Sequence, residues 1–173
     1  NGHSWVSSTG NDMVGRTIAV TPSGDILVAG VRRNTGATQA RIIHAFNTLG
    51  IEQPYSSYED NSNGADAWNS LLVQNNGAIL AGGNWADGPS SRNWSVTRQM
   101  SDLGSDPTFA SVDYDEDGGA ETCFHLNFFS DSSVLAIGTA EVAGDVHIAL
   151  LKYLNDITSG VPDDLSSPGM TAM

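Results

Sequence analysis

One apolar segment occurs three times along this chain at nearly constant spacing. The leucines at its centre, Leu27, Leu80 and Leu135, are 53 and 55 residues apart, and each copy ends in a glycine three residues later. Self-similarity at a fixed period of this length is the signature of a repeat architecture, in which each copy is one supersecondary unit. We therefore expect the chain to fold as three similar units.

A turn precedes each copy of the segment, and an apolar stretch precedes each turn. Glycine and asparagine, which tolerate the positive φ of short hairpin turns, are present in the first two turns. Alternation of period two dominates and no segment has helical periodicity, so the pattern predicts one β-hairpin in every unit. The three turns are Pro22-Ser23-Gly24, Asn75-Asn76-Gly77 and Ser130-Asp131-Ser132.

Two more strands complete the unit. The third strand aligns at a spacing of 54 residues and carries a basic residue in each unit, His44, Arg98 and Lys152, which we expect to pair with acidic neighbours. A short aromatic-containing strand ahead of each hairpin supplies the fourth. The pattern predicts a single all-β domain over residues 1–173, with four-stranded units over about 4–50, 54–104 and 108–158 and a tail over 159–173.

The charge of the chain excludes two classes of partner. It has 20 acidic and 7 basic residues, a formal net charge of −13 and a pI of about 4.2. A phosphate backbone or an anionic membrane surface would repel such a chain. No apolar run approaches the roughly 20 residues of a membrane span. We therefore expect no nucleic acid as a partner and no membrane insertion.

The first unit resembles a known family of repeats. Val20–Gly30 reads VTPSGDILVAG, and a third strand with a basic residue and then Asn47-x-x-Gly50 follow it. This pattern resembles the delta-60 repeat of large bacterial surface and secreted proteins, over about residues 13–155. The second unit lacks the proline, and the third has Ser132 in place of the turn glycine. Such repeats look like propeller blades, so the resemblance implies a propeller-like fold and no enzyme activity.

Three units are few for a closed propeller, which usually has about four to eight blades. The chain is therefore expected to be part of a longer propeller, to assemble with further copies, or to close as a β-trefoil-like barrel, which is the alternative fold. The polar start at Asn1 favours a piece of a longer protein. Open sheet edges promote aggregation, so we expect buried edges or a homo-oligomer.

The N-terminal segment Asn1–Val6 (NGHSWV) gives a second resemblance. It is similar to the Asn-Gly-x-x-Trp-Val segments that often precede the head domains of phage tail-fibre-like proteins and bacterial trimeric fibre proteins. This resemblance implies the tip of an extracellular fibre, a homotrimer, and binding to glycans or other receptors on a cell surface.

An acidic loop is the candidate metal site. Acidic side chains stand at positions one, three, five and nine of a nine-residue segment, with glycine at position six, and Ca²⁺ binds six to eight oxygens. Position twelve is Phe124, so the segment is not an EF-hand; it looks more like the hairpin calcium loops of some propellers. A solvated acidic turn is the simpler interpretation. The candidate ligands are Asp113, Asp115, Asp117 and Glu121.

Two tryptophans flank a polar loop that is the candidate ligand site. Sugar rings bind flat apolar platforms that have hydrogen-bonding groups at their edge. We expect the indoles of both tryptophans to pack in the core or at its rim. The functional alternative is that they form a platform for a sugar ring. The candidate residues are Trp85, Asp87, Arg92, Asn93 and Trp94.

Signals for catalysis are few. The four histidines have no metal-ligand spacing, and neither a nucleophile elbow nor a phosphate-binding glycine loop is present. Cys123, the only cysteine, is in an apolar strand that is typical of an inert core thiol. Carboxylates on polar turns lack the desolvation that raises the pKa of a catalytic acid, so a polysaccharide hydrolase is only the third hypothesis.

The sequence therefore favours a non-enzymatic adhesin, the recognition head of a bacterial or phage-like extracellular fibre that binds a cell-surface glycan or another receptor. No cofactor is expected apart from calcium. The alternative is a structural repeat segment of a larger surface protein with no ligand of its own.

Overall fold

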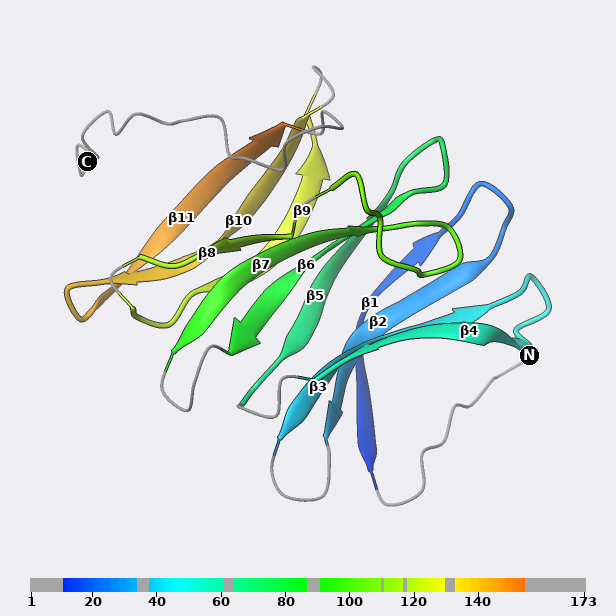
Figure 1. Cartoon of the computed structure of the whole chain (residues 1–173), viewed down its shortest axis with the longest axis horizontal. Helices are drawn as coiled ribbons and strands as arrows, with labels where there is room; N and C mark the ends of the chain where they lie inside the picture. The colour runs from blue at the N-terminus through cyan, green and yellow to red at the C-terminus, as the bar shows by residue number, and fades with distance from the viewer. Residues whose placement is uncertain are drawn as a thin grey trace.

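A computed structural model describes residues 11–33, 38–60, 64–86, 91–109, 111–116, 118–129 and 133–154 (Figure 1). Over these residues the chain forms β-strands and no helix, which confirms the all-β prediction. The described part therefore contains no helix that is long and apolar enough to cross a bilayer. The strands are β1 (Asp12–Val20), β2 (Ile26–Arg33), β3 (Gln39–Phe46), β4 (Glu52–Glu59), β5 (Ala67–Val73), β6 (Ile79–Ala86), β7 (Arg92–Gln99), β8 (Val112–Tyr114), β9 (Thr122–Phe128), β10 (Ser133–Val142) and β11 (Asp145–Leu154).

The strands form three separate antiparallel sheets, and none of them is closed. The first sheet has the order β1-β2-β3-β4, the second β5-β6-β7-β8 and the third β11-β10-β9. Each strand pairs with its neighbour in the sequence, so every sheet is a simple meander. The three predicted hairpins are the pairs β1–β2, β5–β6 and β9–β10.

The fourth strand belongs to a different sheet from the one expected. The sequence placed residues 54–57 ahead of the second hairpin, but β4 pairs with β3 and completes the first sheet. A tight turn between β3 and β4 explains this grouping, since Asn47 and Gly50 hydrogen-bond across it and bring the two strands together.

The strand expected at residues 108–111 is not found there, because Thr108 and Phe109 lie in a turn; the fourth strand of the second sheet is β8, which begins at Val112 and pairs with β7. The third sheet has three strands among the described residues and not the four that were expected.

The glycine that ends each repeated segment has a steric function. A Cβ at Gly30, Gly83 or Gly138 would lie 1.9 to 2.0 Å from a carbonyl oxygen of the preceding strand. A register shift lies close to this contact in every hairpin, as expected at a β-bulge. The repeated glycine therefore lets the two strands approach at the bulge. The carbonyl groups concerned belong to Val14, Ala67 and Thr122.

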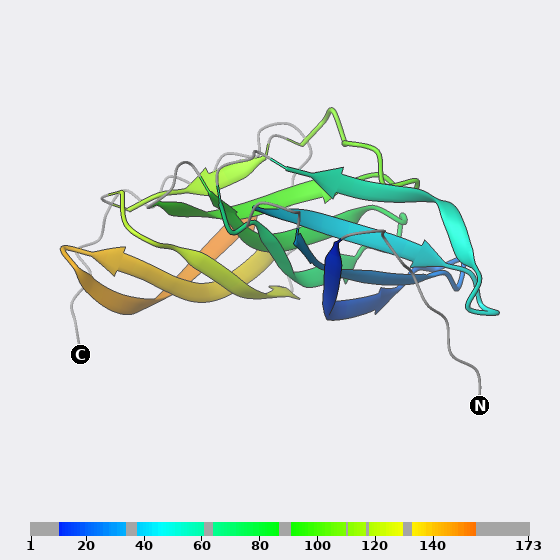
Figure 2. The same ribbon diagram turned by 90° about the horizontal axis from the view of Figure 1, so that it is seen from below.

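The three sheets stack face to face, with the second in the middle (Figures 1 and 2). One core cluster joins the first and second sheets and a second cluster joins the second and third, so the middle sheet is covered on both faces. Six of the eight residues of β7 are buried, and seven of the eight residues of β6. The first cluster comprises Leu27, Ala29, Ile43, Ala45, Trp68, Leu71, Ile79, Ala81 and Leu103; the second comprises Leu80, Trp94, Val96, Phe109, Val112, Cys123, Leu126, Val134, Ala136 and Tyr153.

The second cluster contains the single cysteine. Burial raises the pKa of the Cys123 thiol to about 12, so the thiol is protonated at neutral pH. This environment agrees with the expected inert core thiol.

The register corrects the alignment of the third strands by one residue. Ala45, Arg98 and Lys152 lie opposite the three repeated leucines, so the first-unit equivalent of the two basic residues is Ala45 and not His44. His44 points to the other face of its sheet. Its Nδ1 lies 2.9 Å from Oε1 of Glu52, so the expected acidic partner is present.

Arg98 holds the chain that leads from β7 to β8. Its Nε donates to Oδ2 of Asp106 at 2.7 Å, its Nη2 donates to Oγ1 of Thr108 at 2.9 Å, and the guanidinium lies 4.9 Å from the ring centroid of Phe109. The hydrogen bonds that Asp106 accepts from the hydroxyl and backbone N–H of Thr108, together with Arg98, hold the pKa of the Asp106 carboxyl below its ordinary value. The connection is therefore fixed by a carboxylate that must be ionised.

We expect Asp106→Asn to lower the free energy of unfolding by about 2 kcal/mol at pH 7, because the buried guanidinium loses a charged partner. A carboxyl with a lowered folded-state pKa contributes stability above its ordinary value of 3.8, and this contribution is lost as the pH falls through the folded-state pKa. The difference between the proteins should therefore shrink below about pH 4 in urea unfolding curves. Asp102→Asn, in an exposed turn, is the control, and an equal loss there would contradict the assignment.

Candidate functional site

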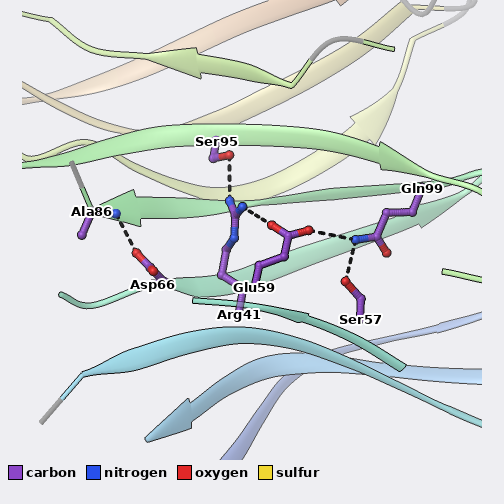
Figure 3. Close-up of polar contacts among 7 residues, drawn as sticks. All are labelled: Arg41, Ser57, Glu59, Asp66, Ala86, Ser95 and Gln99. Carbon is purple, nitrogen blue, oxygen red and sulfur yellow. Dashed lines mark hydrogen bonds and ion pairs between the residues drawn. The ribbon is translucent and has the colours of Figure 1, made fainter. Parts of the chain in front are cut away.

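A polar cluster lies between the first and second sheets, and a buried arginine is at its centre (Figure 3). Along β3, alternate residues face the second sheet: Ile43 and Ala45 enter the core, and Arg41 occupies the next inward position. Strand alternation thus forces a charged side chain into the space between two sheets. The guanidinium is buried and must find its partners there.

Arg41 has polar partners at its edge and aromatic partners on its faces. Its Nη1 donates to Oγ of Ser95 at 2.8 Å, and its Nη2 forms an ion pair with Oε2 of Glu59. The guanidinium carbon lies 3.9 Å from the ring centroid of Trp68 and 4.2 Å from that of Trp85. Arginine suits this position because its planar, weakly hydrated cation can stack and hydrogen-bond at once.

The charge of Arg41 is balanced by several carboxylates. Burial lowers the pKa of the guanidinium, and the negative charges of Glu59, Asp66 and Asp113 oppose this change. A guanidinium keeps its proton in proteins, so the side chain stays charged. The cluster is thus a buried cation in an acidic surrounding.

The hydrogen bonds continue from Glu59 into the second sheet. Nε2 of Gln99 donates to Oγ of Ser57 at 2.9 Å and to Oε1 of Glu59 at 3.4 Å (Figure 3). Glu59 therefore connects a cation from β3 with an amide from β7. A separate bond, from the backbone N–H of Ala86 to Oδ1 of Asp66 at 2.6 Å, fixes the end of β6.

Several of the predicted ligand-binding residues border this cluster. Trp85 is half-buried and lies opposite Asn93 on β7, on the face that looks toward the first sheet. Oδ1 of Asn93 is buried and has no hydrogen-bond partner among the described residues. Arg92 precedes Asn93 on β7, so its exposed side chain faces the other side of the sheet and does not border the cluster; its backbone pairs with Gly119 and Glu121. Asp87 lies outside the described residues.

Trp94 has a different environment. It is fully buried in the second core cluster and contacts Tyr114 edge to face, with ring centroids 6.2 Å apart. Core packing, the expected fate of this ring, is therefore confirmed. Successive side chains of β7 face opposite sides of the sheet, so Trp94 turns away from Trp85 and Asn93, and in this conformation it is not exposed to a ligand beside them.

The four predicted calcium ligands have different environments. Asp113 is exposed on β8 opposite Ser95, near Arg41. Oδ1 of Asp115 accepts a hydrogen bond from the N–H of Gly118 at 2.9 Å. Asp117 lies outside the described residues. Within the described ranges, no three His, Cys, Asp or Glu side chains are grouped so that they could hold a metal ion.

Glu121 is the most unusual of these carboxylates. It is fully buried, and neither oxygen makes a hydrogen bond of normal geometry within the described part of the chain. Burial raises the pKa of its carboxyl, and the charge of Asp115 acts in the same direction, while the nearby backbone amides of Glu116, Glu121 and Glu141 oppose it. Calcium binding at this loop stays a prediction.

Sequence reasoning did not bring together the residues at the centre of the cluster, namely Arg41, Ser57, Glu59, Trp68 and Gln99. A signal for Arg41 was present, because its position alternates with Ile43 and Ala45 and is therefore inward. No such signal marked Glu59 or Gln99, since their meeting depends on how two sheets stack.

A comparison with protein-family models finds no match to the chain, and a comparison with curated proteins finds no significant match. The candidate function therefore rests on the residues and their geometry.

Glu59→Gln tests whether the Arg41 ion pair holds the first two sheets together. We expect it to lower the free energy of unfolding by about 2 kcal/mol, because a buried guanidinium loses its charged partner. The matched control is Glu52→Gln, at the other end of β4, whose more exposed pair with His44 should contribute less than about 1 kcal/mol. Equal losses in chemical unfolding would show that Arg41 does not depend on Glu59.

Proposed function

We propose that this chain is a non-enzymatic recognition domain of an extracellular or cell-surface protein, and that it binds a carbohydrate beside Trp85. The observation that carries the proposal is the half-buried Trp85 ring, which Arg41 contacts on one side and which lies opposite Asn93 of β7. A fixed aromatic ring with hydrogen-bonding groups at its edge is the arrangement that a sugar ring requires.

The neighbours of Trp85 supply the hydrogen-bonding groups. Asp113 is exposed near Arg41, and Asn93 has a buried oxygen without a partner among the described residues. Glu59 is about one third exposed but is held by Arg41 and Gln99. A carboxylate fixed in an ion pair suits binding better than proton transfer, which supports recognition over hydrolysis.

The propeller-like fold belongs to the same proposal. Propeller blades are meander sheets that pack face to face, and each of the three sheets here is a meander built on one copy of the repeated hairpin. Three open sheets in a row also favour this interpretation over a trefoil-like barrel, in which the strands would close on themselves. The delta-60 resemblance agrees with it and stays a proposal.

A second function has its own supporting observation. The outer faces of the first and third sheets expose apolar side chains, among them Ile18, Val20, Ile148 and Leu150. Soluble monomers seldom expose contiguous apolar surface without a partner. These faces favour the alternative, a structural segment whose function is to pack against further sheets.

Glycan-array binding of the wild type and of Trp85→Ala tests the carbohydrate site. We expect the variant to bind at least about tenfold more weakly, which corresponds to about 1.4 kcal/mol. The matched control is Tyr58→Ala, because Tyr58 is also an aromatic ring beside an arginine, Arg32, but lies on the opposite face of the first sheet. The Tyr58→Ala variant should bind glycans as strongly as the wild type does.

Thermal unfolding of both variants separates binding from folding, since Trp85 also supports Arg41. Absence of any glycan binding by the wild type, or equal binding by the wild type and Trp85→Ala, would contradict the carbohydrate proposal and favour the structural alternative.

A further inference from the structure

The outer face of the third sheet is apolar, and no other strand of the described residues packs on it. Ile137 on β10 and Val146, Ile148 and Leu150 on β11 point away from the second sheet. Ile148 is 83% exposed and Leu150 is 62% exposed. The strands β10 and β11 lie at one end of the row of sheets in Figure 1.

The same positions are buried in the other two sheets. Leu150 on β11 pairs with the residue that follows the repeated leucine by two positions on β10. The residues at the equivalent position on β3 and β7 are Ile43 and Val96. Both are 0% exposed, against 62% for Leu150. In each of the first two sheets this face is therefore a contact with the next sheet, and only in the third does the described chain leave it open.

The opposite end of the row has the complementary face. Ile18 on β1 is 66% exposed, while its equivalents Leu71 on β5 and Leu126 on β9 are 6% and 0% exposed. Leu71 and Leu126 pack against the preceding sheet in the two core clusters. The outer face of the first sheet is thus built to cover a preceding sheet that the described residues do not include.

Other positions on this face agree. Ile79 and Ala81 of β6, and Val134 and Ala136 of β10, are the buried residues that cover the preceding sheet. Their equivalents on β2 are Ile26 and Val28, which are apolar and only partly buried. The face that would cover a third sheet is therefore already present in the chain.

We propose that the outer face of the third sheet, around Ile148 and Leu150, binds the outer face of the first sheet, around Ile18 and Val28, of a second copy of this chain. The contact would repeat between chains the packing that joins the first sheet to the second, and the second to the third, within one chain. It is heterologous, because two different surfaces meet.

Two copies are enough to cover the outer faces of both first sheets and both third sheets. Each copy would offer its third sheet to the first sheet of the other, which makes two identical contacts and a closed ring of six sheets. Six is within the usual range of about four to eight blades for propellers, whereas a ring of three copies would have nine. The proposed assembly is thus a dimer and differs from the homotrimer that the N-terminal resemblance implies.

Charge sets the conditions for association. Each copy has a formal net charge of −13, so long-range repulsion opposes association while the apolar faces drive it. Salt screens the repulsion between exposed charges. Association should therefore strengthen with ionic strength, opposite to the behaviour of an interface held by ion pairs.

Light scattering coupled to size exclusion, at increasing protein concentration and at low and high salt, tests the proposal. We expect a mass of twice 18.2 kDa at high concentration and salt. Leu150→Glu should weaken the dimer at least about tenfold, because it places a charge in an apolar contact. Leu49→Glu is the control, since Leu49 is also a leucine and is even more exposed, but lies in the turn between β3 and β4.

A mixture of two single variants tests the head-to-tail geometry. Leu150→Glu leaves the first-sheet face intact, and Ile18→Glu leaves the third-sheet face intact, so each alone should be monomeric while an equimolar mixture should form a dimer through one contact. Circular dichroism confirms that both variants fold, and Ile148→Glu replaces Leu150→Glu if the latter does not.

Three results would overturn the proposal: a wild type that stays monomeric at every concentration and salt, a trimer, or a Leu150→Glu variant that dimerises as well as the wild type. A mixture that stays monomeric would also do so, because it would exclude the pairing of different faces. None of these results bears on glycan binding by Trp85, which is measured separately.

Discussion

Burial of the middle sheet on both faces is the constraint on which the rest of this structure depends. Leu80 and Val96 look toward the third sheet, while Ile79 and Ala81 look toward the first. A sheet buried on both sides needs apolar or small residues at successive positions, and β6 begins Ile-Leu-Ala-Gly-Gly. The two outer sheets are held in place chiefly by packing on this one, so its strands set the position of both core clusters.

The candidate site is a consequence of that stacking. Arg41 occupies an inward position at the edge of the first core cluster, where the apolar contacts between the sheets give way to Trp68, Trp85 and Glu59. The ion pair and the two indoles stabilise the charge of Arg41, whose side chain lies between the sheets because side chains alternate along a strand. The same contacts hold Trp85 in a fixed orientation next to Asn93, so one arrangement serves packing and presents an aromatic ring.

The sequence predicted those features that depend on local pattern, namely the all-β class, the repeated hairpins and the glycine that ends each segment. It did not predict the sheet to which residues 54–57 belong, because a short strand can pair on either side. The register of the third strand was off by one at His44, because Arg41 and His44 place one basic residue on each face of β3, so a basic residue alone does not show which position matches Arg98 and Lys152. The contact between Glu59 and Gln99 could not be predicted for another reason. It depends on how two sheets pack, and the two residues are 40 positions apart in the sequence.

Native-state hydrogen exchange followed by NMR tests the central claim most directly. If the middle sheet is the packing centre, backbone amides of β6 and β7 around Leu80 and Val96 should exchange most slowly, at rates set by global unfolding, and those of β1 and β11 should exchange faster through local opening. Slower exchange in β1 or β11 than in β6 would contradict this account, because it would place the most stable part of the structure in an outer sheet.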